Sequence, residues 1–465
     1  MKFVTIIRRW LMAIAGLMLT AGCAQEEVTQ SADGVGADMA VNFSPYLQQK
    51  RQGGSTRADS PGLATLKETG FSVFACHHTD ATYSLTGDMG TRSFNFMYNE
   101  QLTWNATEGR WEYSPVKYWP NGTDEANADN SPSNTATEAN QTYLSFFAIA
   151  PYFEYKSDKS GYPDCITDLT ASNVASASSY VTYESPLKPG QGTDLLWAGN
   201  VNLYKQKTTG EGYVNGHVQM PFVHALTQLG VTVQARVDES DGYHSDLYSD
   251  EVNERTRILI ESVTLTNATK SGNLYIANQQ MTPRWATITT EDISIDGSGT
   301  HATVTASLSN TYTDGAEKKW AGKTGTDYYL YNSSGTYTDT EAAATAFAAL
   351  PEGVTNVEQN LYAEGGNFLM PPSTLNSVVI TYYVVTYDEH LELNAPQYFS
   401  IVKNEVTYSG GIPALENNKV YRLRLLLGLT SVKFELLELE EWGETVILSA
   451  IVKDWDVETK EYDVE

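Results

Sequence analysis

Apolar and polar residues alternate with a period of two along most of the chain. This alternation is typical of β-strands, because successive side chains of a strand point to opposite faces of a sheet. Turn-forming Gly, Asn, Asp and Ser residues separate the alternating runs. Strands are therefore predicted at residues 71–74, 144–146, 218–222, 231–235, 258–260, 263–265, 378–380, 423–427, 432–436 and 446–450.

Helical periodicity is scarce, and Ala342 to Leu350 is the best candidate for a helix. The polar stretches Thr123 to Thr142 and Ser309 to Thr340 are expected to form loops or irregular insertions. Many short strands with polar turns favour an all-β fold of two tandem antiparallel β-sandwiches with long loops. A chain of 465 residues also exceeds one domain of roughly 100–200 residues. The predicted boundary gives an N-terminal sandwich at 58–225 and a C-terminal sandwich at 226–465.

Residues 1–22 have the layout of a secretory signal, with basic residues before an apolar run from Trp10 to Leu19. Small residues then precede Cys23, as in the box of bacterial lipoproteins. Cys23 is therefore the predicted lipidation site. The alternative is an ordinary secretory signal in which this cysteine is incidental. The apolar run is too short to span a membrane.

Residues 23–57 are predicted to form a lipidated tether and a propeptide strand. The segment 24–37 is small and polar, as linkers are, and Val41 and Phe43 then alternate with polar neighbours. Gln48 to Ser60 is a polar, glycine-containing stretch, which is accessible to proteases.

The chain is strongly acidic, with a formal net charge of −27 that becomes −30 when the three basic residues of the signal are removed. The negative electrostatic field of such a chain repels polyanions, so nucleic acid and anionic membrane surfaces are poor partners. Solubility at a cell surface is the simplest explanation. No later segment reaches about 18 consecutive apolar residues, so none is predicted to cross a membrane.

Candidate chemistry is sparse. Cys76 and Cys165 either pair in an oxidising compartment or remain buried thiols, and the sequence leaves both open. Cys76-His77-His78 contains zinc-ligand types, but strand alternation divides them between two faces and no second cluster completes a site. Asp388-Glu389-His390 is interpreted as an ordinary acidic turn. Neither group is predicted to bind metal or to catalyse a reaction.

The sequence contains no nucleophile elbow, phosphate-binding glycine loop or zinc-protease helix, so no enzyme activity and no cofactor is predicted. Its 57 acidic residues include pairs of carboxylates, but nothing specific supports a glycosidase. The aromatic run Asp327 to Tyr331 is suited either to stacking on sugar rings or to filling a sandwich core.

Several short motifs occur in one order over nearly all of the chain after residue 38. They are Trp111–Pro115 with Lys117–Pro120, Leu144–Ala148, Asp194–Ala198, Phe222–Leu226, Val263–Asn267 with Gly272–Leu274, Asn418, Tyr421–Leu423, Leu427–Leu429 and Ile451–Trp455. Together they are similar to the motifs of the fimbrillin family, the type V pilus subunits of gram-negative anaerobes. The resemblance implies transthyretin-like sandwiches of Greek-key type.

The resemblance also implies export as a lipoprotein and cleavage by an arginine-specific surface protease. Ser55-Thr56-Arg57-Ala58 resembles the family's cleavage site, so Arg57 is the residue expected to be recognised. Lys50-Arg51 is a second accessible basic site. The alternative is that Arg57 lies in an uncut loop.

Cleavage in this family implies strand exchange, in which a strand of the next subunit replaces the strand that is removed. The displaced strand would contain Val41 and Phe43. The donor would come from Thr445 to Glu465, where alternating apolar residues are Val446, Leu448, Ala450 and Val452. The same segment is equally suited to be a resident last strand of the C-terminal sandwich.

The resemblance thus predicts a structural pilus subunit that serves adhesion or biofilm formation. It would be an outer-membrane lipoprotein precursor at the cell surface and then part of the fimbrium. Its partners would be other pilus subunits, the outer membrane through its lipid, the protease and a host or glycan ligand. The alternative is a surface lipoprotein that does not polymerise, and instead binds glycan or anchors the pilus.

Overall fold

The structure is a computed structural model in which Val41–Glu465 forms one compact unit. It describes residues 40–47, 61–79, 94–120, 142–170, 179–186, 190–203, 217–235, 255–278, 281–296, 319–321, 327–329, 339–348, 350, 353–361, 367–391, 398–429, 431–441 and 444–452. Among these residues, no helix has both the length and the apolar character needed to cross a bilayer.

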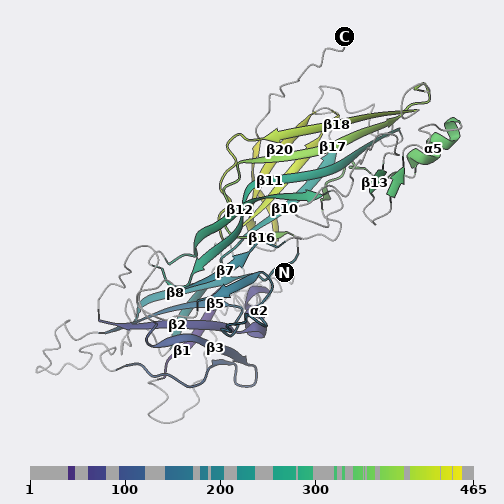
Figure 1. Cartoon of the computed structure of the whole chain (residues 1–465). Coiled ribbons are helices and arrows are strands. Elements are labelled where there is room, and N and C mark those ends of the chain that lie inside the picture. Colours follow the sequence, from purple (N-terminus) through teal and green to yellow (C-terminus); the bar gives the residue numbers. More distant parts are fainter. Residues whose placement is uncertain are drawn as a thin grey trace, which may run out of the picture. The chain divides into compact units, whose positions relative to one another are not determined.

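Seven strands form the first sheet in the order β1-β9-β8-β5-β2-β3-β4 (Figure 1). Neighbouring strands are antiparallel except β1 and β9, which run parallel. Their bounds are β1 Asn42–Leu47, β2 Phe71–His78, β3 Met97–Asn105, β4 Arg110–Glu112, β5 Tyr143–Ala150, β8 Leu196–Leu203 and β9 His217–His224.

The second sheet has the order β15-β10-β19-β20-β21, and β16 also pairs with β10. Here β10 and β19 are parallel, whereas the other neighbours are antiparallel. Its strands are β10 Thr227–Ala235, β15 Gln359–Asn360, β16 Phe368–Met370, β19 Lys419–Leu427, β20 Val432–Glu441 and β21 Glu444–Val452.

The third sheet has the order β18-β17-β11-β7-β6, and β12 pairs with the other edge of β11. Figure 1 shows β18, β17, β11 and β12 as neighbouring arrows. The strands are β6 Ile166–Leu169, β7 Tyr180–Glu184, β11 Thr256–Tyr275, β12 Arg284–Asp296, β17 Ser377–Tyr387 and β18 Phe399–Tyr408.

Three hydrophobic clusters hold these sheets together. One face of the first sheet forms a cluster with Val41, Phe43 and Leu66. The opposite face packs Phe147 and Trp197 against residues of β6, β7 and the end of β11. The third cluster lies between β10, β19 and β20 of the second sheet and β11 and β17 of the third. Because β5 lies between two clusters, its sequence is an almost continuous apolar run.

Two helices are described, α2 (Pro61–Thr69) and α5 (Thr340–Ala348). Helix α5 confirms the predicted helix, and it begins where the Asp339 side chain accepts a hydrogen bond from Ala342 N at 2.8 Å. Helix α2 was not predicted, because within its described part only Leu66 is buried and an apolar stripe is missing. It ends at Gly70, whose φ of 69° suits a helix C-terminus.

The predicted all-β fold class is confirmed. One expectation was too simple: Ser309 to Thr340 contains the paired strands β13 (Lys319–Ala321) and β14 (Asp327–Tyr329). The polar composition hid them, since three-residue strands are too short for alternation to show. The other polar stretch, Thr123 to Thr142, lies outside the described residues except for Thr142.

The chain passes from the first sheet to the second between His224 and Thr227, beside the predicted domain boundary. However, β6 and β7 precede this point and pair within the third sheet, whose other strands all follow it. The boundary at residue 225 stays a prediction.

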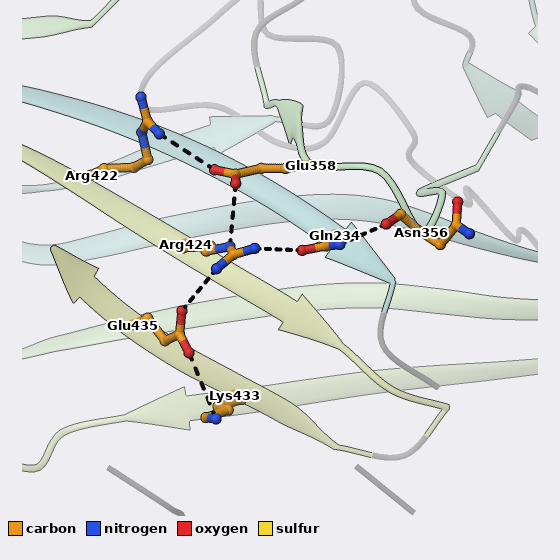
Figure 2. A network of polar contacts seen from close by, with 7 residues as sticks. All are labelled: Gln234, Asn356, Glu358, Arg422, Arg424, Lys433 and Glu435. Atoms are coloured by element: carbon orange, nitrogen blue, oxygen red, sulfur yellow. Dashed lines mark hydrogen bonds and ion pairs between the residues drawn. The ribbon is translucent and has the colours of Figure 1, made fainter. Parts of the chain in front are cut away.

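A polar network crosses the second sheet on the face opposite its apolar cluster (Figure 2). Arg424 Nη2 donates a hydrogen bond to Gln234 Oε1 at 2.8 Å, which joins the parallel strands β19 and β10. The Arg424 guanidinium also lies 3.4 Å from carboxylate oxygens of Glu358 and Glu435. Lys433 is 3.7 Å from Glu435, and Arg422 is 3.8 Å from Glu358. The nearly buried Glu435 carboxylate thus has two cationic partners.

Candidate functional site

The N-terminal strand β1 occupies one edge of the first sheet and is buried there. Val41 is fully buried and the Phe43 side chain is 4% exposed. Phe43 lies opposite Val218 and Pro45 opposite Met220 in the parallel ladder with β9. Pro45 lacks an amide hydrogen, which an edge strand tolerates. The predicted strand around Val41 and Phe43 is confirmed, and it completes the sheet.

Aromatic rings form the walls around Phe43. Its ring centroid lies 5.7 Å from that of Tyr113 and 5.6 Å from that of Phe146, both in edge-to-face geometry. Such pairs add directional contacts to the burial of apolar area. Val218, Met220 and Phe222 from β9 belong to the same cluster.

Two hydrogen bonds clamp the backbone where β1 begins. Tyr113 Oη donates to Val41 O at 2.7 Å, and Val41 N donates to Lys117 O at 2.9 Å. Burial raises the pKa of Tyr113 to about 12, so the phenol remains a donor at physiological pH. The clamp therefore holds Val41, the residue just before β1, on the side that β9 does not cover.

We call this arrangement the β1 slot: the edge of β9, the Phe146 ring and the segment Tyr113 to Trp119. It offers a strand ladder on one side, apolar positions for alternating side chains, and a backbone clamp. Such a site binds an extended peptide through main-chain hydrogen bonds and alternating side-chain pockets.

Two of the sequence motifs meet in this slot. Tyr113 and Lys117 belong to the motif of residues 111–120, and Phe146 belongs to the motif of residues 144–148. No role for their side chains was predicted, because nothing in the sequence indicates that a tyrosine 72 residues from Val41 bonds to its carbonyl. Their aromatic character was the only available signal.

Other motifs meet at the turn between β9 and β10. His224 Nδ1 lies 2.7 Å from Asp194 Oδ2, and His224 N donates to Asn418 Oδ1 at 3.2 Å. Trp285 Nε1 donates to Ala225 O at 2.7 Å. These contacts fix the path between the first two sheets, so this buried histidine has a structural role.

The predicted processing residues Cys23 and Arg57 lie outside the described residues, as do Lys50 and Arg51. The predicted donor residues Val446, Leu448, Ala450 and Val452 lie in β21, whose side chains are not described. Its backbone pairs antiparallel with β20, with Ala450 opposite Leu437 and Val452 opposite Glu435. In this structure the segment is the last strand of the second sheet.

The Cys76-His77-His78 group has ordinary surroundings. Cys76 is buried in β2, His78 Nε2 lies 2.8 Å from Ser145 Oγ, and His77 N donates to Asn95 Oδ1 at 2.7 Å. Within the described ranges, no three His, Cys, Asp or Glu side chains gather where they could hold a metal ion. Cys76 and Cys165 are not joined in a disulfide, and burial raises the pKa of Cys165 to about 11.

Two other groups that the sequence analysis considered are Asp388-Glu389-His390 and the aromatic run Asp327 to Tyr331. His390 N donates to Asp388 Oδ1 at 2.9 Å, and the His390 side chain is 81% exposed, as in a solvated turn. Of the aromatic run Asp327 to Tyr331, the first three residues form β14, and the side chains lie outside what the structure describes.

The fold and the β1 slot define an all-β protein whose N-terminal strand completes a sheet from its edge. No protein-family profile matches the chain. A curated relative is fimbrium subunit Fim1C of Phocaeicola vulgatus, which is 27% identical over 249 residues. The match covers 52% of this chain and 55% of Fim1C, so the chain spans about half the length of its relative.

Two solved structures are similar at low TM-scores. The fimbrial anchor protein Mfa2 of Porphyromonas gingivalis is 10% identical with a TM-score of 0.32, covering 88% of this chain and 99% of Mfa2. A fimbrial assembly protein of Parabacteroides distasonis is 9% identical with a TM-score of 0.28, covering 88% and 99%.

The predicted resemblance to fimbrial subunits is confirmed: the chain is a relative of a fimbrium subunit. That relative is named as a subunit of a fimbrium.

Proposed function

We propose that this protein is a structural subunit of a cell-surface pilus. It is exported as a lipoprotein acylated at Cys23, cut after Arg57, and polymerised by exchange of β1 for the C-terminal segment of a neighbouring subunit. The observation that carries the proposal is the β1 slot, in which Phe43 of the edge strand and Val41 just before it are buried.

The position of β1 in the chain supports this proposal. Arg57 lies between the end of β1 at Leu47 and the start of α2 at Pro61. A cut there separates β1 covalently from the rest of the sandwich. Rebinding then becomes bimolecular, and the high effective concentration of a tethered strand is lost.

A neighbour's β21 is a suitable replacement strand. It spans nine residues, compared with six in β1, so it offers a longer ladder and more apolar side chains. An empty slot would expose an unpaired edge and an apolar surface, which favours aggregation, so cleavage after export is physically sensible. Head-to-tail strand addition is heterologous and open, and therefore produces a filament.

In this proposal the precursor is held at the outer membrane by its lipid, and the mature subunit resides in the fimbrium. An arginine-specific surface protease and the other pilus subunits are its partners. Adhesion to a host or glycan ligand, or biofilm formation, is the biological outcome.

The intact mass and N-terminal sequence of protein taken from the cell surface without heating test the proposal. A start at Ala58 without lipid, together with a ladder of multimers, supports it. A start at acylated Cys23 in a monomer contradicts polymerisation, and then an anchor subunit or a glycan-binding lipoprotein is the better account.

A matched pair of variants locates the cut. Arg57→Ala should abolish the ladder and leave a precursor with β1 in place, whereas Arg51→Ala should polymerise normally. The reverse result would move the cleavage site to Lys50-Arg51.

A further inference from the structure

Strand β18 forms a long and regular edge of the third sheet (Figure 1). All ten of its residues pair with β17 without a register shift, from Tyr387 opposite Phe399 to Val378 opposite Tyr408. In the described part of the chain, β17 is the strand's one partner. Among the described residues, no strand pairs with the other edge of β18, so its main-chain donors and acceptors there are suited to a partner strand.

Other edge strands are protected in ways that β18 is not. Strands β4 and β6 have three and four residues, which is too short for a stable added strand. Strand β12 is longer, but three register shifts interrupt its ladder with β11. Short edges and bulges are usual devices that prevent pairing between sheets.

The charges on β18 are complementary to those of a second copy in one register. Lys403 and Glu405 flank Asn404. If two copies pair antiparallel about a twofold axis at Asn404, each Lys403 lies directly opposite the other copy's Glu405. Shifting one strand by two residues in either direction places Lys403 opposite Lys403 or Glu405 opposite Glu405. Opposite charges stabilise cross-strand pairs and like charges destabilise them.

The apolar residues and the lysine agree with the same register. Val402 is 48% exposed, and it would lie opposite the second copy's Val406. The Lys403 ammonium lies 2.8 Å from Glu261 Oε2 and 5.5 Å from the centroid of the Tyr383 ring. These contacts hold Lys403 on the sheet face that Glu405 shares, because residues two apart in a strand lie on one face.

We propose that β18 is an interaction surface for a second copy of this chain, joined antiparallel about Asn404 so that the two third sheets become continuous. A pair of ten-residue strands buries less surface than a standard interface, which buries about 1,200–2,000 Å². The contact is therefore weak between single molecules and gains strength where many copies are linked. It is separate from the proposed strand exchange, and in a polymer it would join subunits side by side.

Disulfide trapping tests the register. Asn404→Cys places two thiols opposite each other at a Cα separation of about 4.5–5.5 Å, within the range that disulfides accept. Thr407→Cys is the matched control, because residue 407 would lie opposite Ile401. Both are made in the uncut, full-length chain with Cys23→Ser, and that parent reports any background from Cys76 and Cys165.

Mild oxidation should give a covalent dimer of the Asn404→Cys protein and little from Thr407→Cys or the parent. Equal dimer yields from the two cysteine variants, or no dimer from either, would overturn the proposal. Because the chain is uncut, this result is separate from the outcome of the polymerisation test.

Charge exchange provides an independent test by sedimentation. Glu405→Lys should weaken self-association about tenfold, because two attractive pairs become repulsive. Lys403→Glu should do the same, and Lys403→Glu/Glu405→Lys should restore association to near the parental value. If the double variant associates as weakly as the singles, the predicted register is wrong.

Discussion

Phe43 is the one buried side chain among the described side chains of β1, so Phe43→Ala measures how much this strand stabilises the fold. The ring is 4% exposed and lies edge-to-face against Tyr113 and Phe146. Truncating a buried phenylalanine costs about 3–5 kcal/mol. An edge strand can relax around the cavity, so we expect the lower end, about 3 kcal/mol.

The assay is urea unfolding of the uncut chain, followed by tryptophan fluorescence, since Trp119 is buried in the same cluster. Ser44→Ala is the matched control, because Ser44 is the next residue, lies on the opposite face of β1 and is partly exposed. Its effect should stay within about 0.5 kcal/mol. Equal effects of the two substitutions would refute the assigned role of the slot.

A second comparison links this prediction to strand exchange. If the proposed cleavage removes β1, Phe43→Ala should destabilise the uncut protein and leave the stability of assembled multimers unchanged. A multimer destabilised by Phe43→Ala would show that β1 remains in the slot after assembly.

Three further predictions concern the clamp, the polar network and helix α5. Tyr113→Phe removes the hydrogen bond to Val41 O and should cost about 1 kcal/mol of unfolding free energy, whereas Tyr118→Phe at an exposed position should not. The folded-state pKa of Tyr113 is raised to about 12, so its contribution to the free energy of unfolding is complete below pH 10 and is lost as pH rises from about 10 to 12. When stability is measured across this pH range, Tyr113→Phe should lose less free energy of unfolding than the parent does. Arg424→Met leaves the 3.7 Å contact to Lys433 as the remaining cationic contact of Glu435 among the described residues. Chemical denaturation should show a larger loss than for Glu435→Gln, which removes the buried charge itself. Asp339→Ala removes the cap of α5 and should cost about 1 kcal/mol, detected as faster amide exchange in that helix, and Asp339→Asn should retain most of it.

Alternation in the sequence predicted the most regular strands, because side-chain periodicity is a local property of the extended backbone. Strands β8, β12 and β18 were not predicted, because their apolar and polar residues do not alternate clearly. The runs at 144–146, 218–222 and 423–427 lie in β5, β9 and β19. Helix α5 was predicted because helical periodicity is also a local property of the sequence. Helix α2 was missed because a short helix with one buried leucine in its described part has no periodic stripe.

The sequence alone determined an all-β chain, the strand around Val41 and Phe43, and the motifs that relate the chain to fimbrial subunits. Only the tertiary structure decided which strands pair: β1 runs parallel to β9, β10 runs parallel to β19, and β7 joins β11. Partner choice depends on residues that are distant in the chain, as in the bond between Tyr113 and Val41. Local periodicity specifies the faces of a strand but not its neighbour, so the β1 slot emerged only from the folded arrangement.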